Sequence, residues 1–322
     1  MTEKPIPSAL GESLVAAAVA AANPLLGQWY SQPELERNFA HALAGDLRRL
    51  ESLELAEQFR HHCPVPGAEP EDYRNRLLEL DGSGWALIGI RFRGLDLARP
   101  FIALVAASRP LAWPGELLSV ADRAARAYAL FRPKHLRIFV PSHLELDVDE
   151  VGGGYWERRL LAAPIATLQS LPKPDHYRRI MLVQAQDLGF YDGYRAAYEE
   201  LLHESPGHAE YATAESAEDM QRYLDTGCVF EVYVDSEWAG IVGGFPEREQ
   251  GLSGLTVAEM FLAGRYRGLG LGAAMQRRFL GELDSALGLL WGAIDVRNVS
   301  ALRTALRCGR VDVGGYLWLP CA

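Results

Sequence analysis

The feature that most constrains this chain is an apolar strand followed by three glycines at alternating positions. Residues 256–263 have strand character, Gly268, Gly270 and Gly272 follow, and residues 272–287 show the apolar spacing of a helix. Alternating glycines let backbone N–H groups converge and let a ligand approach without a Cβ in the way. The helix start adds free N–H groups and the positive end of its dipole. Strand, turn and helix together predict a site for an anion such as a pyrophosphate.

The charge of this region differs from that of the rest of the chain. Between Arg265 and Arg310 there are eight arginines and three acidic residues, a local net charge of +5, whereas the whole chain carries −10. Positive charge confined to one segment points to a small polyanionic ligand. The acidic total argues against a general nucleic-acid binder, because the phosphate backbone demands a basic face.

The 322 residues exceed what one average domain needs, and the two halves of the chain show a similar order of elements. The first half begins with helices, of which one is capped by Ser31 and extends to about Phe59. The other expected elements there are strands 85–92, 101–107 and 135–140 and helix 115–131. In the second half we expect strands 179–184, 229–234, 238–243, 256–263, 289–296 and 314–319, and helices 191–203, 215–224, 272–287 and 300–308. This repetition predicts an α/β fold with an internal duplication.

A break rich in glycine and proline separates the halves. Three consecutive glycines occupy 152–154, and residues 164–174 contain Pro164, Pro172 and Pro174. We therefore expect an N-terminal α/β domain over 1–163, a linker over 164–178 and a second domain over 179–322.

Three interpretations of the glycine turn compete. In the first, it is a glycine-rich structural turn. In the second, it is a dinucleotide-binding turn, because residues 268–273 also satisfy GxGxxA and Asp295 ends a later strand. Against the second, only 27 residues follow Asp295, too few for the remaining βαβ units, and the preceding strands read as an antiparallel meander. The third interpretation rests on a family resemblance.

Arg267-Gly-Leu-Gly-Leu-Gly272, after an apolar strand, resembles the acyl-CoA-binding motif (Q/R)xxGx(G/A) of the GCN5-related N-acetyltransferase (GNAT) superfamily. The resemblance covers about residues 179–319, and the family's next motif is matched by Asn298, Ala301 and Gly309. It implies a mixed, mostly antiparallel sheet flanked by helices, present twice, in a tandem arrangement with a degenerate N-terminal copy. It also implies an acetyltransferase that uses acetyl-CoA as co-substrate and an amine as acceptor.

The resemblance assigns roles to residues of this chain. The strand before the loop pairs with the pantetheine arm, a role that falls to Phe261, Leu262 and Ala263. The pyrophosphate is held by the loop and the first helical turn, that is, by Arg267, Gly268, Leu269, Gly270, Leu271, Gly272 and Ala273. Asn298 is the remaining residue expected to bind the cofactor. Glu259 is the candidate general base, and a solvent-facing or arginine-paired glutamate is the alternative.

Two positions depart from the family pattern. Ala305 stands where many members have a tyrosine that acts as general acid, and Arg310 replaces the usual phenylalanine. Tyr316 is the candidate substitute acid, and a core aromatic is the alternative. Because the tyrosine is lost, a non-catalytic acyl-CoA-binding sensor is the rival to an enzyme. Arg303 and Arg307 either contact phosphate or form a solvated helix face.

The first half offers no equivalent phosphate site. If residues 101–107 correspond to 256–263, the loop becomes 108–115, where Pro110 and Pro114 remove N–H donors and alternating glycines are absent. We expect this half to be a packing partner, a lid or a dimerisation surface, which leaves a homodimer open.

Other classes of partner find little support in the sequence. The four cysteines lie too far apart for a metal knuckle, and His61, His62 and Cys63 have no matching ligand pair nearby, so no metal is expected. No apolar run of about 18 residues indicates a membrane span. Residues 14–22 resemble a signal-peptide core, but an alanine-rich helix is the preferred interpretation. We expect a cytoplasmic protein that binds a small-molecule amine or a peptide, with the acceptor undetermined.

Overall fold

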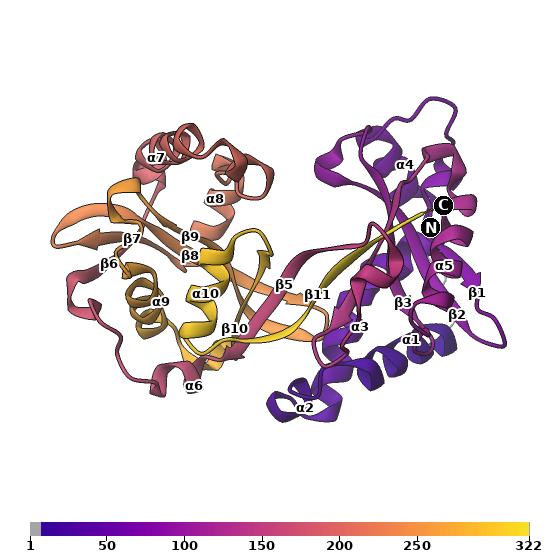
Figure 1. Cartoon of the computed structure of the whole chain (residues 1–322), viewed down its shortest axis with the longest axis horizontal. Coiled ribbons are helices and arrows are strands. Elements are labelled where there is room, and N and C mark those ends of the chain that lie inside the picture. Colours follow the sequence, from indigo (N-terminus) through magenta and orange to yellow (C-terminus); the bar gives the residue numbers. More distant parts are fainter. Residues whose placement is uncertain (1–7, 322) are drawn as a thin grey trace. The chain divides into compact units, whose positions relative to one another are not determined.

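The computed structural model describes residues 8–321, and the chain forms two units (Figure 1). Unit 1 comprises the chain up to Arg158, Arg248–Leu252 and the chain from Val313 onward. Unit 2 comprises Arg159–Glu247 and Ser253–Asp312. Each unit contains a sheet flanked by helices, which agrees with the predicted α/β class.

The helices of unit 1 are α1 (Ser8–Ala21), α2 (Leu26–Trp29), α3 (Gln32–Glu51), α4 (Leu53–His62) and α5 (Gly115–Ala127). Its strands are β1 (Arg76–Glu79), β2 (Trp85–Phe92), β3 (Pro100–Ala107), β4 (His135–Pro141) and most of β11 (Val311–Pro320), in the sheet order β1-β2-β3-β4-β11. The β3–β4 pair is parallel, and the other pairs are antiparallel.

Neighbouring residues on the strands of unit 1 face opposite helical layers, as the two-residue period of a strand requires. Ile88 and Leu104 pack in a cluster with Val120 of α5. Leu87 and Val105 pack with α1 and α3. Helices therefore cover both faces of the sheet of unit 1.

The helices of unit 2 are α6 (Ile165–Ser170), α7 (Tyr191–Glu204), α8 (Ala217–Leu224), α9 (Leu271–Glu282) and α10 (Val299–Arg307). Its strands are β6 (Ile180–Gln184), β7 (Val229–Val234), β10 (Leu289–Asp295) and most of β5 (Tyr155–Pro164), β8 (Glu237–Glu249) and β9 (Leu252–Leu262), in the order β5-β10-β9-β8-β7-β6. The β9–β10 pair is parallel, whereas β6–β7 and β7–β8 are antiparallel.

The sheet of unit 2 is also covered on both faces. Phe230 and Val242 pack in a cluster with Phe279 of α9, whereas the adjacent Val229 and Ile241 pack with α7 and α8. In Figure 1, α7 and α8 lie together, as do α9 and α10. The predicted mixed sheet flanked by helices is confirmed.

The domain boundaries differ from those expected. Residues 164–178, expected to be a linker, contain α6, whose Ile165 and Leu168 are fully buried in the core of unit 2. The C-terminal strand, expected in the second domain, pairs with β4 from Gly314 to Pro320 and so belongs to unit 1. Both differences arise from pairing and packing between segments far apart in the sequence, which local patterns do not encode.

The helix expected from Ser31 to about Phe59 begins as predicted and then breaks. Ser31 and Glu34 form a capping box, in which the Ser31 N–H donates to Glu34 Oε2 at 2.8 Å. The helix ends at Glu51, and the hydroxyl of Ser52 accepts from the N–H of Leu55 to start α4. A second cap inside the periodic run explains the break.

Candidate functional site

The parallel pair in unit 2 separates part-way along its length. Pairing between β9 and β10 covers Gly254–Thr256 and Leu289–Trp291, although β9 continues to Leu262 and β10 continues to Asp295. Beyond Thr256, the edge of β9 that faces β10 no longer takes part in this ladder. An unpaired strand edge suits an extended ligand, although the N–H of Met260 already donates to Glu259 and the carbonyl of Leu262 accepts from Arg267.

The loop after β9 owes its shape to two of its three glycines. Gly268 and Gly270 have φ angles of +74° and +76°, in the left-handed region that favours glycine. Gly272 lies in the first turn of α9 and has a different reason to be small, because a Cβ there would lie 3.3 Å from Cγ2 of Thr304. The motif thus combines two turn glycines with one glycine at which α10 approaches α9.

The loop opens onto the N-terminus of α9, where Gly270 is the N-cap. The first N–H groups of a helix have no carbonyl one turn earlier, so those of Leu271, Gly272 and Ala273 suit an anion. Gly268, Leu269 and Gly270 are exposed beside them. The structure therefore brings the predicted loop residues together around one helix start.

Arg267 supports the loop through its side chain. Its backbone N–H donates to the carbonyl of Gly264 at 3.0 Å, and its Nε donates to the carbonyl of Leu262 at 2.7 Å. The guanidinium also lies over the ring of Phe261, 4.9 Å from the centroid. Burial lowers the pKa of Arg267 below its usual value. These contacts join the end of β9 to the loop.

The other residues expected on the pantetheine strand have structural partners of their own. Phe261 is buried and stacks on the ring of Tyr198, with centroids 4.8 Å apart. The N–H of Ala263 donates to the carbonyl of Ala239 at 2.8 Å. Leu262 supplies the carbonyl that Arg267 binds. Their roles toward a cofactor stay predictions.

The local positive charge is less concentrated on the loop than the sequence indicates. Most of the eight arginines are engaged elsewhere: Arg265 with Glu237, Arg267 with Leu262 O, Arg277 with Leu171 O, Arg278 with Tyr177 O, Arg297 with Asp295 and Arg310 with Gln276. Arg303 and Arg307 of α10 are exposed. A charge count cannot distinguish an arginine that faces a ligand from one that caps a neighbouring helix.

Glu259 lies on the separated part of β9. The residue is half-buried, and its Oε2 accepts a hydrogen bond from the hydroxyl of Tyr194 at 2.6 Å, while its Oε1 accepts from the N–H of Met260 at 2.9 Å. Burial of the carboxyl group raises the pKa of Glu259 to about 7, against the lowering effect of these two hydrogen bonds. In the part of the chain that the structure describes, this carboxylate binds Tyr194 and Met260 and no arginine, which disagrees with the arginine-paired alternative.

Tyr194 and Glu215 are residues of this site that the sequence reasoning missed. Tyr194 is fully buried, and its hydroxyl also accepts from the N–H of Glu215 at 2.9 Å. Burial raises the pKa of the Glu215 carboxyl, which accepts from Tyr223 at 3.2 Å. For Tyr194 the sequence contains a signal, because Tyr191, Tyr194 and Tyr198 have the i, i+3, i+7 spacing of one helix face.

The second motif has a local structural role. Asn298 is the N-cap of α10, and its Oδ1 accepts from the N–H of Ala301 at 3.2 Å. Ala305, at the position of the family tyrosine, is fully buried. A cofactor contact by Asn298 stays a prediction.

Tyr316 lies in unit 1, whereas Glu259 and the glycine loop lie in unit 2. Its ring is buried, its hydroxyl donates to Glu249, and it accepts from Nε2 of Gln250 at 3.3 Å. Burial raises its pKa. These contacts are those of a core aromatic, and its role as general acid stays a prediction.

Arg310 is a buried cation with incomplete hydrogen bonding. It is 3% exposed, and its Nη2 donates to Oε1 of Gln276 at 3.0 Å. Its Nε and Nη1 have no hydrogen-bond partner among residues 8–321. Burial lowers its pKa to about 10. The departure from phenylalanine therefore places a desolvated charge inside unit 2.

Replacing this cation should stabilise the protein. The double variant Arg310→Met with Gln276→Leu removes the buried charge and its hydrogen-bond partner together, and we expect the free energy of unfolding to rise by about 1–4 kcal/mol. The exposed Arg307→Met is the control and should change it by less than about 0.5 kcal/mol. Urea unfolding measures both. A destabilised double variant would show that the guanidinium has bonding partners that the contacts above do not include.

Comparison with known proteins identifies the fold. No family model and no curated protein sequence matches the chain. Among solved structures, a GCN5-related N-acetyltransferase from Sphaerobacter thermophilus is 13% identical, with a TM-score of 0.52 over 99% of this chain and 95% of that one. The chain has the GNAT fold.

Two further solved structures match with lower TM-scores. A GNAT-family acetyltransferase from Colwellia psychrerythraea is 10% identical, with a TM-score of 0.49 over 84% of this chain and 98% of that one. The C-terminal domain of a putative lysylphosphatidylglycerol synthetase from Agrobacterium fabrum is 9% identical, with a TM-score of 0.38 over 83% and 92%.

Residues 8–321 contain neither a candidate membrane-spanning helix nor a candidate metal site. No helix within residues 8–321 is long and apolar enough to cross a membrane. In the same part of the chain, no group of three or more His, Cys, Asp or Glu side chains is arranged to hold a metal ion.

Proposed function

We propose that unit 2 transfers an acetyl group from acetyl-CoA to an amine by direct attack in a ternary complex. The observation that carries this proposal is the separation of β9 from β10 just before a left-handed glycine loop that opens onto the start of α9. The strand edge suits the amide groups of the pantetheine arm, and the helix start suits the pyrophosphate. The GNAT fold supports the same assignment.

Glu259 is the base in this proposal. The acceptor amine forms a C–N bond with the thioester carbonyl carbon, the C–S bond breaks, and CoA leaves as a thiolate. The amine proton passes to the Glu259 carboxylate, directly or through a water molecule. A carboxylate with a pKa of about 7 suits this step, because it is largely ionised just above neutral pH and still accepts a proton readily.

The rival is a sensor that binds acyl-CoA without catalysis. The missing tyrosine at Ala305 favours it, whereas the buried carboxyl of Glu259, with its raised pKa, favours an enzyme. The acceptor class extends from small amines to peptides. Unit 1 is, in this proposal, a degenerate copy of unit 2, since each contains a parallel strand pair as well as antiparallel pairs.

Thermal unfolding with acetyl-CoA tests the donor assignment. At about 100 times its dissociation constant, acetyl-CoA should raise the free energy of unfolding by about 2.7 kcal/mol. NAD at the same concentration is the control and should leave the unfolding temperature unchanged. Stabilisation by NAD and not by acetyl-CoA would overturn the proposal, as would the absence of any shift with acetyl-CoA.

A further inference from the structure

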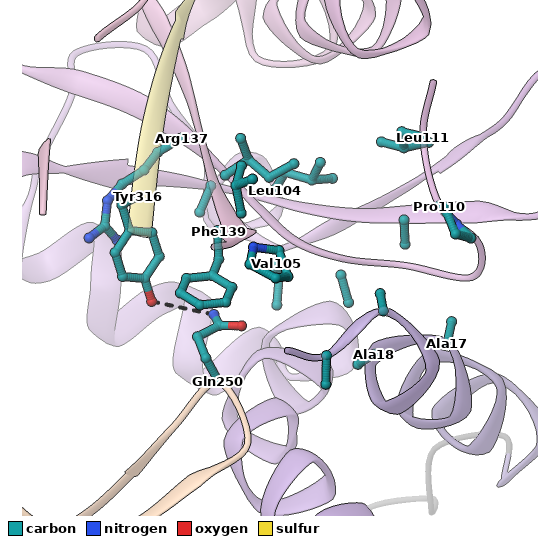
Figure 2. A pocket seen from close by; sticks show the side chains of 18 of the residues that line it. Ala17, Ala18, Leu104, Val105, Pro110, Leu111, Arg137, Phe139, Gln250 and Tyr316 are labelled. Atoms are coloured by element: carbon teal, nitrogen blue, oxygen red, sulfur yellow. Dashed lines mark hydrogen bonds between the residues drawn. The ribbon is translucent and has the colours of Figure 1, made fainter. Parts of the chain in front are cut away.

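Unit 1 contains a cavity of its own, remote in sequence from the glycine loop. Its volume is about 460 Å³, within the range of small-ligand sites. Figure 2 shows part of its lining, which includes Ala17 and Ala18 of α1 and Leu104 and Val105 of β3. Every lining residue belongs to unit 1, so the cavity does not depend on unit 2.

Incomplete strand pairing and the short side chains of one helix leave this space open. The parallel pairing of β3 with β4 covers only Ile102–Leu104 and Leu136–Ile138, although β3 continues to Ala107 and β4 continues to Pro141. The helix next to the opening is the alanine-rich α1, whose short side chains leave the space unfilled. A gap lined by side chains too small to close it can accept an apolar guest.

Polar groups gather at one end of the cavity. The guanidinium of Arg137 lies over the ring of Tyr316, 3.5 Å from the centroid, and its Nε donates to Glu157 at 2.9 Å. Gln250 reaches the same point and donates to the hydroxyl of Tyr316 (Figure 2). Glu157 also binds Arg93 at 3.2 Å, so one carboxylate holds two guanidinium groups in place. The hydroxyl of Tyr316 and the amide of Gln250 are the neutral polar groups at this end, and they suit a small polar head.

The loop after β3 does not form a phosphate cradle. Arg109 is bound to Glu116 at 3.0 Å and to the carbonyl of Asp81 at 2.8 Å, and Pro110 and Pro114 lack N–H groups. Arg109, which lines the cavity, is therefore held by protein groups. Within residues 108–115, two of the N–H groups that could hold a phosphate are absent.

We propose that unit 1 binds an amphiphile with a hydrocarbon body and one small polar head. The body lies between α1 and the separated strands β3 and β4, and the head lies near Gln250 and Tyr316. Apolar walls with a few convergent polar groups are the usual composition of such sites. This binding is separate from acetyl transfer and does not rest on it.

Decanol binding to the full chain tests the proposal, by calorimetry and by the fluorescence of Trp113, which lines the cavity. The wild type should bind decanol saturably at one site. Ala18→Phe places an aromatic ring in the cavity and should weaken binding by about tenfold or more. Ala16→Phe, on the exposed side of the same helix and outside the lining, should bind like the wild type.

Three controls separate the outcomes. Circular dichroism establishes that Ala18→Phe is folded, and Ala18→Leu replaces it if it is not. Decyl phosphate should bind more weakly than decanol, because the polar end offers no anion cradle. Absence of saturable binding by the wild type would overturn the proposal. Equal weakening by Ala16→Phe and Ala18→Phe would overturn it too. Acetyl-CoA stabilisation should persist in Ala18→Phe, so failure here is distinguishable from failure of the proposed function.

Discussion

Glu259→Gln is expected to lower kcat/KM for acetyl transfer by about 100- to 10,000-fold, the usual contribution of a positioned general base. Glutamine has nearly the same shape and can still accept the hydrogen bond from Tyr194, but it cannot take a proton. The assay follows release of the CoA thiol with a panel of amines: spermidine, an aminoglycoside, free amino acids and a peptide with a free N-terminus. An unchanged rate would show that Glu259 is not the base.

The pH dependence gives a sharper readout of the same residue. The base must be ionised, so kcat/KM should rise with pH through an apparent pKa of about 7 in the wild type, and this limb should vanish in Glu259→Gln. Tyr194→Phe is the companion variant. The hydrogen bond from Tyr194 lowers the pKa of Glu259. Without it that pKa rises, so the ascending limb of the pH profile should move to higher pH. A limb that stays in place would show that Tyr194 does not act on this carboxylate.

The raised pKa also predicts how stability changes with pH. The folded state binds the Glu259 proton more tightly than the unfolded chain, where the pKa is about 4.5. The stabilising contribution is therefore fully present below pH 4.5 and is lost as the pH rises through about 7. Urea unfolding should show the wild type losing stability relative to Glu259→Gln across that window.

The parts of unit 2 that depend on neighbouring residues could be predicted from the sequence. The helix expected over 272–287 corresponds to α9, which ends earlier, at Glu282. The strand expected over 289–296 is β10, and the helix expected over 300–308 is α10. Periodicity, glycine positions and one asparagine cap determine these elements locally.

What could not be predicted depends on contacts between distant segments. Tyr194 approaches Glu259 across 65 positions of sequence, and β11 pairs with β4 across more than 170. Neither contact can be predicted from local sequence, because the spacing of the tyrosines indicates one face of a helix but not the residue that this face contacts. The arginines illustrate the same limit, because Arg277 and Arg278 raise the charge count near the loop but bind carbonyls that lie about a hundred residues earlier.

Gly268→Asp is expected to weaken acetyl-CoA binding by about 100- to 1000-fold relative to Gly268→Asn. Among residues 8–321, apart from Gly268 and its two chain neighbours, no atom lies within 4 Å of a Cβ placed on Gly268. Its left-handed backbone is one that both asparagine and aspartate tolerate. The two side chains have the same size and differ by one negative charge. At about 4 Å from a phosphate charge, that difference is worth about 4 kcal/mol near a protein surface.

The matched pair separates binding from folding. An acidic side chain just ahead of α9 interacts favourably with the helix dipole, so Gly268→Asp should unfold at a temperature at least as high as Gly268→Asn without ligand. Only the rise in unfolding temperature on addition of acetyl-CoA should differ between the two variants. Salt should reduce this difference, because it screens the repulsion between the aspartate and the phosphate. If both variants bind acetyl-CoA equally, the pyrophosphate does not lie at this loop, and the assignment of the α9 N-terminus fails while the fold stands. If only the aspartate variant loses binding, the loop carries the anion, because shape and backbone strain are common to the two.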